Sequence, residues 1–171
     1  NKKLIADCNS IRTTFIQKEQ LPLSKEQILE MGYDGYSELD TIYHIGKIEN
    51  KSIKAPIWPT SFSYLKIGGI YSMITGEAMV NTGPPNYLIP FTVSHEIAHQ
   101  LGFASEQEAN FLGYLACIHH PNPSFRYSGS LAALRYSMSA LYHADSAMNA
   151  QLLTEIDPRV KMDLKVNQEY W

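Results

Sequence analysis

His95-Glu96-Ile97-Ala98-His99 is the most informative stretch of this 171-residue chain, for its local structure and for its chemistry. Side chains four positions apart in a helix lie on the same face, so His95 and His99 present two imidazoles to one point. Zn²⁺ binds imidazole nitrogens at about 2.0–2.1 Å, and this spacing suits it. Glu96 follows the first histidine, where it can take a proton from a water activated by the metal. The stretch therefore predicts a helix that carries two metal ligands and a general base.

The residues that follow supply candidates for a third ligand. Gly102 is placed to end the helix, and Ser105 to cap a new one in which Glu108 completes a capping box. Because Glu108 then has a structural role, we expect Glu106 to be the third ligand, with Glu108 as the alternative. Asn110, four residues after Glu106, lies on the same helix face and can orient a ligand by a hydrogen bond. Together with the two histidines, Glu106 gives the three protein ligands and one open position of a catalytic zinc site.

These residues resemble known metallopeptidase motifs. Glu106 and Asn110 are spaced like the Glu-x-x-x-Asp element of gluzincins, in which the glutamate is the third zinc ligand and the aspartate orients a ligating histidine. Two departures stand out: the interval from His99 to the glutamate is much shorter than in thermolysin-like enzymes, and Asn110 replaces an aspartate, so its hydrogen bond is neutral and weaker. The metzincin pattern is disfavoured, because its third histidine falls at Ser105.

The stretch from Thr75 through the histidine motif to Gly129 resembles one group in particular. That group is an uncharacterised domain-of-unknown-function family of HExxH proteins, found mainly in Bacteroidetes-type bacteria and usually preceded by transmembrane helices. The resemblance runs from Ala55 to the C-terminus. It implies a gluzincin-like zinc metallopeptidase that acts on a peptide or protein, and a domain anchored to a bacterial membrane by segments outside residues 1–171. We expect a monomer.

Composition limits the remaining classes. The length suits a single domain over residues 1–171, with a helical front over 1–54 and a site-bearing part over 55–171. Hydrophobic residues make up 44% and charged residues 18%, as in ordinary globular proteins. The net charge of −3 provides no basic field, which argues against a nucleic-acid partner. Two cysteines are too few for a disulfide framework.

Helices are expected at both ends of the chain. A first amphipathic helix covers 4–16 and ends by Pro22, Ser24 caps a second that reaches Glu30, and a third covers 37–46. Two prolines exclude regular structure for residues 55–60. The histidine helix begins at Tyr87 or Pro90, and later helices are expected over 105–119, 129–144 and 146–156.

Strands are expected between the connector and the histidine helix. They are short runs separated by glycines, over 64–67, 69–74 and 77–81, and Thr75-Gly76 turns the last two into a hairpin. The fold is therefore predicted to be α+β: a mostly helical zincin-like domain with a small antiparallel sheet before the histidine helix.

Resemblance to zincins also implies a role for one of these strands. In zincins an edge strand before the active helix bonds the backbone of an extended substrate. Glu77, Ala78 and Met79 are the candidates for that strand. The alternative is an internal hairpin with no free edge, in which Glu77 is a solvated strand charge.

A further side chain is expected to stabilise the oxyanion of the tetrahedral intermediate. Tyr127 is the first candidate, because it follows Pro121 and Pro123 in a loop-like stretch, and the alternative is an ordinary packing tyrosine. Weaker candidates nearby are Arg135, Tyr136 and His143.

These observations predict a zinc-dependent peptidase in which Glu96 is the general base and His95, His99 and Glu106 hold Zn²⁺. A metal-binding regulatory or sensor domain without turnover is the alternative. A helical scaffold that binds no metal is the third possibility.

Overall fold

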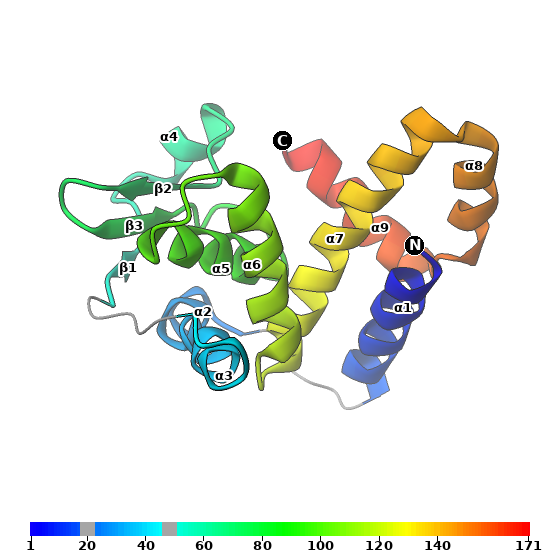
Figure 1. Cartoon of the computed structure of the whole chain (residues 1–171). Helices are drawn as coiled ribbons and strands as arrows, with labels where there is room; N and C mark the ends of the chain where they lie inside the picture. Colours follow the sequence, from blue (N-terminus) through cyan, green and yellow to red (C-terminus); the bar gives the residue numbers. More distant parts are fainter. Residues whose placement is uncertain (18–22, 46–50) are drawn as a thin grey trace.

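The computed structural model describes residues 1–17, 23–45 and 51–171, in which a small sheet lies at one side of a mostly helical body (Figure 1). The elements are α1 (Lys2–Gln17), α2 (Lys25–Met31), α3 (Asp34–Tyr43), β1 (Ile53–Lys54), α4 (Pro59–Tyr64), β2 (Gly69–Ser72), β3 (Glu77–Val80), α5 (Ile89–Gln100), α6 (Glu106–His119), α7 (Pro123–Ala144), α8 (Ser146–Glu155) and α9 (Pro158–Tyr170). The mostly helical α+β class is confirmed.

Helix α5, which carries the histidine motif, lies at the centre of one hydrophobic cluster. Ile89, Val93 and Ile97 are buried along it. Pro90 stands in its first turn, where the missing N–H has no partner to lose. The helix packs against α6, α7, α2 and the strands β2 and β3, which places the motif between the sheet and the following helices (Figure 1).

A second hydrophobic cluster joins α7 to α1, α8 and α9. Leu131, Leu134 and Met138 of α7 are buried there with Ile5 of α1 and Val160 of α9. These α7 side chains thus form part of the core. Among the described residues before position 55, α1 contacts α7 and α9, whereas α3 contacts α6 and α2 contacts α5.

The sheet is mixed, with the strand order β1-β3-β2. The hairpin of β2 and β3 is antiparallel, with Ile70 opposite Met79, as predicted from the glycine-containing turn. The prediction of a wholly antiparallel sheet is wrong, because β1 adds to the other side of β3 in parallel. The expected strand over 64–67 is also wrong: α4 ends at Tyr64 and a turn follows.

Several helix boundaries differ from the prediction for local reasons. Ser24 caps α2 in a full capping box with Gln27, but α3 starts at Asp34, ahead of the predicted residue 37. Helix α4 starts within the expected irregular stretch, since Pro59 is tolerated in a first helical turn. The predicted helix ends at Pro22 and Gly46 lie outside the described residues.

The C-terminal part departs furthest from the prediction. Helix α7 begins six residues early, because the side chain of Asn122 accepts from the N–H of Ser124 and Pro123 occupies its first turn. Helix α9 was not predicted, and Asp157 caps it before Pro158. Across the described ranges, no helix has the length and apolar character needed to cross a bilayer.

Candidate metal centre

Helix α5 presents both histidines of the motif to one point, as the spacing predicts. The side chains of His95 and His99 are 13% and 14% exposed. Their Nε2 atoms are 3.1 Å apart. Gly102 then ends the helix in the left-handed region, with φ of 94°, which a glycine adopts without strain.

The turn after α5 brings the first residue of α6 back over the two imidazoles. Oε2 of Glu106 lies 3.3 Å from Nε2 of His95, and Oε1 lies 3.5 Å from Nε2 of His99. The three ligand atoms lie within 4.8 Å of one another, in an arrangement able to hold a metal ion. The structure thus brings His95, His99 and Glu106 together.

The spacing of these atoms fits a small tetrahedral cation. Ligands at about 2.0–2.1 Å from one tetrahedral ion stand about 3.3–3.4 Å apart. The two Nε2 atoms, at 3.1 Å, lie near that spacing, and each imidazole has a different oxygen of Glu106 at a similar distance, 3.3 Å for His95 and 3.5 Å for His99. The side chain of Glu106 is 71% exposed, so the three ligand candidates lie at the surface of the molecule on that side, where a substrate can approach.

The Nε2 atoms of both rings face each other, and a hydrogen bond at Nδ1 orients the ring of His99. Nδ1 of His99 lies 2.7 Å from the carbonyl oxygen of Phe103, which favours the tautomer with its proton on Nδ1 and a free lone pair on Nε2. Burial and the neighbouring His99 lower the pKa of His95, which favours the neutral form that binds metals. Nδ1 of His95 is buried and makes no hydrogen bond within the described chain.

Asn110 lies against the His95 ring from the second turn of α6. Its side chain and that of Glu106 act to raise the pKa of His95, against the larger effect of burial. The amide oxygen of Asn110 also lies 3.5 Å from the hydroxyl of Tyr136 on α7. Asn110 is therefore placed where the sequence predicted, beside a ligand candidate.

The alternative third ligand, Glu108, does not join the cluster. Its predicted capping box with Ser105 does not form, because the Ser105 side chain makes no cap hydrogen bond and instead donates to Gln107. Glu108 is exposed on α6. The choice of Glu106 over Glu108 thus agrees with the geometry, although the capping argument for it is wrong.

Glu96 is buried at the floor of the same cleft as the two histidines. It is 4% exposed, and a Cβ atom on Gly69 of β2 would come within 2.4 Å of its Oε1. The missing side chain of Gly69 therefore makes room for the carboxyl group beneath the strand. Burial, and then the charge of Glu106, raise the pKa of Glu96 to about 8. A carboxyl group with such a pKa exchanges protons near neutral pH, as a general base must.

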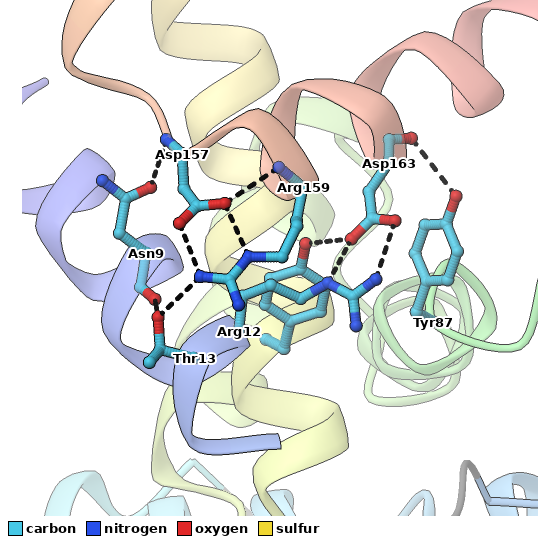
Figure 2. A network of polar contacts seen from close by, with 8 residues as sticks. Asn9, Arg12, Thr13, Tyr87, Asp157, Arg159 and Asp163 are labelled. Carbon is cyan, nitrogen blue, oxygen red and sulfur yellow. Dashed lines mark hydrogen bonds and ion pairs between the residues drawn. The ribbon is translucent and has the colours of Figure 1, made fainter. Parts of the chain in front are cut away.

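Tyr127 does not reach this cleft, so its predicted oxyanion role is wrong. It lies inside α7 and is 2% exposed, and its hydroxyl donates to Oδ2 of Asp163. Figure 2 shows the surrounding network, in which Asp163 also pairs with Arg12 of α1 and its backbone oxygen accepts from Tyr87. The tyrosine is a packing residue that ties α7 to α9.

The predicted substrate strand is also placed differently. Glu77, Ala78 and Met79 belong to β3, which is paired on both sides by β1 and β2. The prediction of a free edge there is wrong, and Glu77 forms a surface ion pair with Lys54. Strands β1 and β2 are the edges of the sheet instead, and residues of β2 line the cleft.

The cleft above the cluster measures about 890 Å³ and draws its walls from the sheet, α5, α6, α7 and the C-terminus. Two of the weaker candidates, Arg135 and Tyr136, line it, whereas His143 does not. Sequence analysis missed Lys66 and Trp171, which also line the cleft. No sequence signal pointed to them, because both are isolated residues brought in by the fold.

Gln100 is a further positioning residue that sequence analysis missed. Its amide donates to the carbonyl oxygens of Ser52 at 2.9 Å and Gly76 at 3.0 Å, and its oxygen accepts from Tyr33. It thereby fixes the sheet against the end of the histidine helix. Its place directly after the motif was the available signal.

The chain matches, over residues 1–171, the model of a family described as "Protein of unknown function (DUF3810)", and it belongs to this family. No curated protein and no solved structure matches the chain. The match confirms the expectation that the chain belongs to an uncharacterised family. It does not bear on the resemblance to zincins.

Proposed function

We propose that this protein is a zinc-dependent peptidase of gluzincin-like type. The observation that carries the proposal is the convergence of His95, His99 and Glu106, whose ligand atoms lie within 4.8 Å of one another, with the buried carboxyl group of Glu96 in the same cleft. Two neutral imidazoles and one carboxylate are a ligand set used by catalytic zinc sites. When bound, zinc supplies Lewis-acid chemistry, which polarises a peptide carbonyl and makes water more acidic.

The residues of the chain have distinct tasks in this reaction. Glu96 accepts a proton from the attacking water and returns it to the leaving amine, and its raised pKa suits both transfers. Strand β2 offers its outer edge to an extended peptide by strand addition, in place of β3. Tyr136 replaces Tyr127 as the candidate for the oxyanion, because it lines the cleft and its hydroxyl points toward Asn110.

The replacement Glu96→Gln tests the peptidase function. It keeps the shape of the side chain and removes the base, so we expect zinc content to stay at the wild-type value while cleavage of a peptide library falls by about 10²–10⁴-fold. Zinc content and cleavage are measured on the same preparations by elemental analysis and mass spectrometry. Equal cleavage by variant and wild type would contradict the mechanism. Stoichiometric zinc without cleavage by the wild type would favour the metal-binding regulatory alternative.

We further propose that the domain acts as a monomer, attached to a bacterial membrane through segments outside residues 1–171. The support is the sequence resemblance to proteins with preceding transmembrane helices. Membrane fractionation of the protein expressed from its own gene, followed by light scattering of the purified domain, tests both points. Recovery in the soluble fraction, or a dimeric mass, would contradict them.

A further inference from the structure

We propose that the cleft binds its substrate through a carboxylate group, which Arg135 holds with the help of Lys66. The inference deepens the proposed peptidase function and rests on it for the expectation that peptides enter the cleft. Both side chains line the cleft that contains His95, Glu96 and Glu106. Arg135 comes from α7, and Lys66 from the turn before β2, so the two cations belong to different elements.

A series of ring contacts connects Arg135 to His95 of the candidate metal site. Its Cζ atom lies 4.5 Å from the centre of the Tyr136 ring, a cation–π arrangement. The Tyr136 ring lies 6.5 Å from that of Phe91, which in turn lies 6.3 Å from His95. Stacking on Tyr136 orients the guanidinium group while its N–H donors remain available for a ligand.

Arg135 is also the arginine whose donors the protein itself does not use. Arg12 pairs with Asp163, Arg159 pairs with Asp157, and Arg126 donates to two backbone carbonyl groups. Within the described ranges, Arg135 meets no carboxylate and no carbonyl oxygen. An arginine at a cleft wall with its donors unpaired suits bidentate recognition of a carboxylate from outside the chain.

The backbone that carries Lys66 is fixed in place. Lys66 adopts a left-handed conformation, with φ of 56°, which is strained for a residue that carries a Cβ atom. Asn81, which is 1% exposed, holds the following turn by donating its amide to the carbonyl oxygen of Ile67 at 3.0 Å. Its backbone N–H donates to Gly68 at 2.8 Å. The lysine thus stands at the start of β2, the strand proposed to bind the substrate backbone.

These cations give the cleft a preference that the whole molecule lacks. The chain has a net charge of −3, so a general attraction for acidic ligands is not expected. The carboxylate recognised can belong to an aspartate or glutamate side chain of the substrate, or to its C-terminus. The first source indicates an endopeptidase with acidic specificity, and the second a carboxypeptidase.

Peptide binding to the zinc-loaded Glu96→Gln protein separates these sources without requiring turnover. Four fluorescent peptides of one sequence carry either glutamate or glutamine at one internal position, and either a free or an amidated C-terminus. We expect a carboxylate at one of these places to lower the Kd by about tenfold or more at low salt. Fluorescence anisotropy measures the Kd, and the favoured peptide identifies the source.

Variants of the two cations assign the preference to them. In a Glu96→Gln background, Arg135→Ala should bring the acidic and neutral peptides to within twofold of each other, and Arg135→Lys should retain part of the difference. Lys66→Ala should reduce the difference severalfold. Lys161→Ala, which removes an exposed cation of α9 outside the cleft, is the matched control and should leave it unchanged.

Any of three binding results would overturn the inference: equal binding of all four peptides, no binding of any, or a carboxylate preference that survives Arg135→Ala. The last result would mean that the metal itself holds the carboxylate. Cleavage of neutral and acidic peptides at equal rates by the wild type would reject the inference and keep the peptidase function. A preference that depends on Arg135, without cleavage by the wild type, would reject the peptidase function and keep the inference.

Discussion

Two of the polar clusters among the described residues differ in how their hydrogen-bond donors and acceptors balance. Around Asp163, a carboxylate meets the guanidinium group of Arg12 and the hydroxyl of Tyr127, so each acceptor faces a donor (Figure 2). Around His99, two imidazole Nε2 atoms and the carboxylate of Glu106 face one another. A single proton can form a hydrogen bond across only one of these contacts, whereas a metal cation can bind all of the acceptor atoms at once.

This difference in donor and acceptor balance distinguishes a buried cluster that stabilises the fold from one that binds a ligand. A buried network in which a carboxylate pairs with a guanidinium group and a hydroxyl holds helices together, as Asp163 does for α9 against α1 and α7. A group of acceptors that converge needs a partner from outside the chain. Both clusters contain buried titratable side chains, so burial alone does not identify the functional one. The balance of donors and acceptors does.

Asp163→Ala is expected to have the largest effect on stability. The substitution leaves the partly buried guanidinium group of Arg12 without its carboxylate, which costs about 3–5 kcal/mol for buried pairs. Urea unfolding measures the free energy, and the exposed Glu38→Ala is the control. Zinc content of the folded variant should match that of the wild type. Loss of zinc without loss of stability would assign this network to the metal centre.

The stability of the metal-free protein should fall as the pH rises from about 5 to 8. The pKa of Glu96 is raised from 4.5 to about 8, so the folded state binds more protons than the unfolded state in this window. The stabilising contribution is full below the unfolded pKa and is lost as the pH rises through the folded one, and about 3–4 kcal/mol of it is lost between pH 5 and 8.

Urea unfolding at several pH values, with a chelator present, measures this dependence. The Glu96→Gln variant lacks the titrating group and should lose most of the change between pH 5 and 8. An equal pH dependence in variant and wild type would show that Glu96 is not the group responsible.

Glu106→Ala should weaken zinc binding by about 100-fold, because it removes a ligand atom from the metal. Glu108→Ala is the matched control on the same helix and should change the zinc Kd by less than about twofold, as is usual for an exposed side chain outside a site. Competition with a zinc chelator measures both constants. The reverse order would move the third ligand to Glu108.

Asn110→Ala should have the smallest effect, a zinc Kd weakened by about tenfold. Asn110 contacts the His95 ring and touches no metal position itself, and such supporting residues contribute about 10–100-fold in affinity. Asn110→Asp should bind zinc more tightly than wild type, since it places a negative charge beside the His95 ring and the bound cation. Equal affinities for all three proteins would remove Asn110 from the site.

Sequence analysis predicted most of what a local pattern encodes. The spacing within His95–His99 determined the helix face, Gly102 the turn after it, and Ser24 the start of α2. Glu106 was reached through a capping argument that the structure contradicts, although the residue itself is correctly placed.

The errors arise where tertiary contacts decide. Tyr127 follows two prolines, but Asn122 and Pro123 start a helix there, and its hydroxyl bonds to Asp163, 36 residues away. Strand β3 is internal because the two-residue strand β1 pairs with it, and a strand that short leaves no periodic signal. The buried face of α9 includes polar residues, so it has no apolar periodicity that would predict the helix.

The most direct test of the account is the metal itself. The purified protein, stripped with chelator and titrated with Zn²⁺, should bind one ion per chain, and zinc X-ray absorption should show two imidazole nitrogens and carboxylate oxygen at about 2.0–2.2 Å. His99→Ala should abolish stoichiometric binding while the fold, followed by circular dichroism, is kept. A protein that binds no zinc, or binds it equally well without His99, would contradict the central claim.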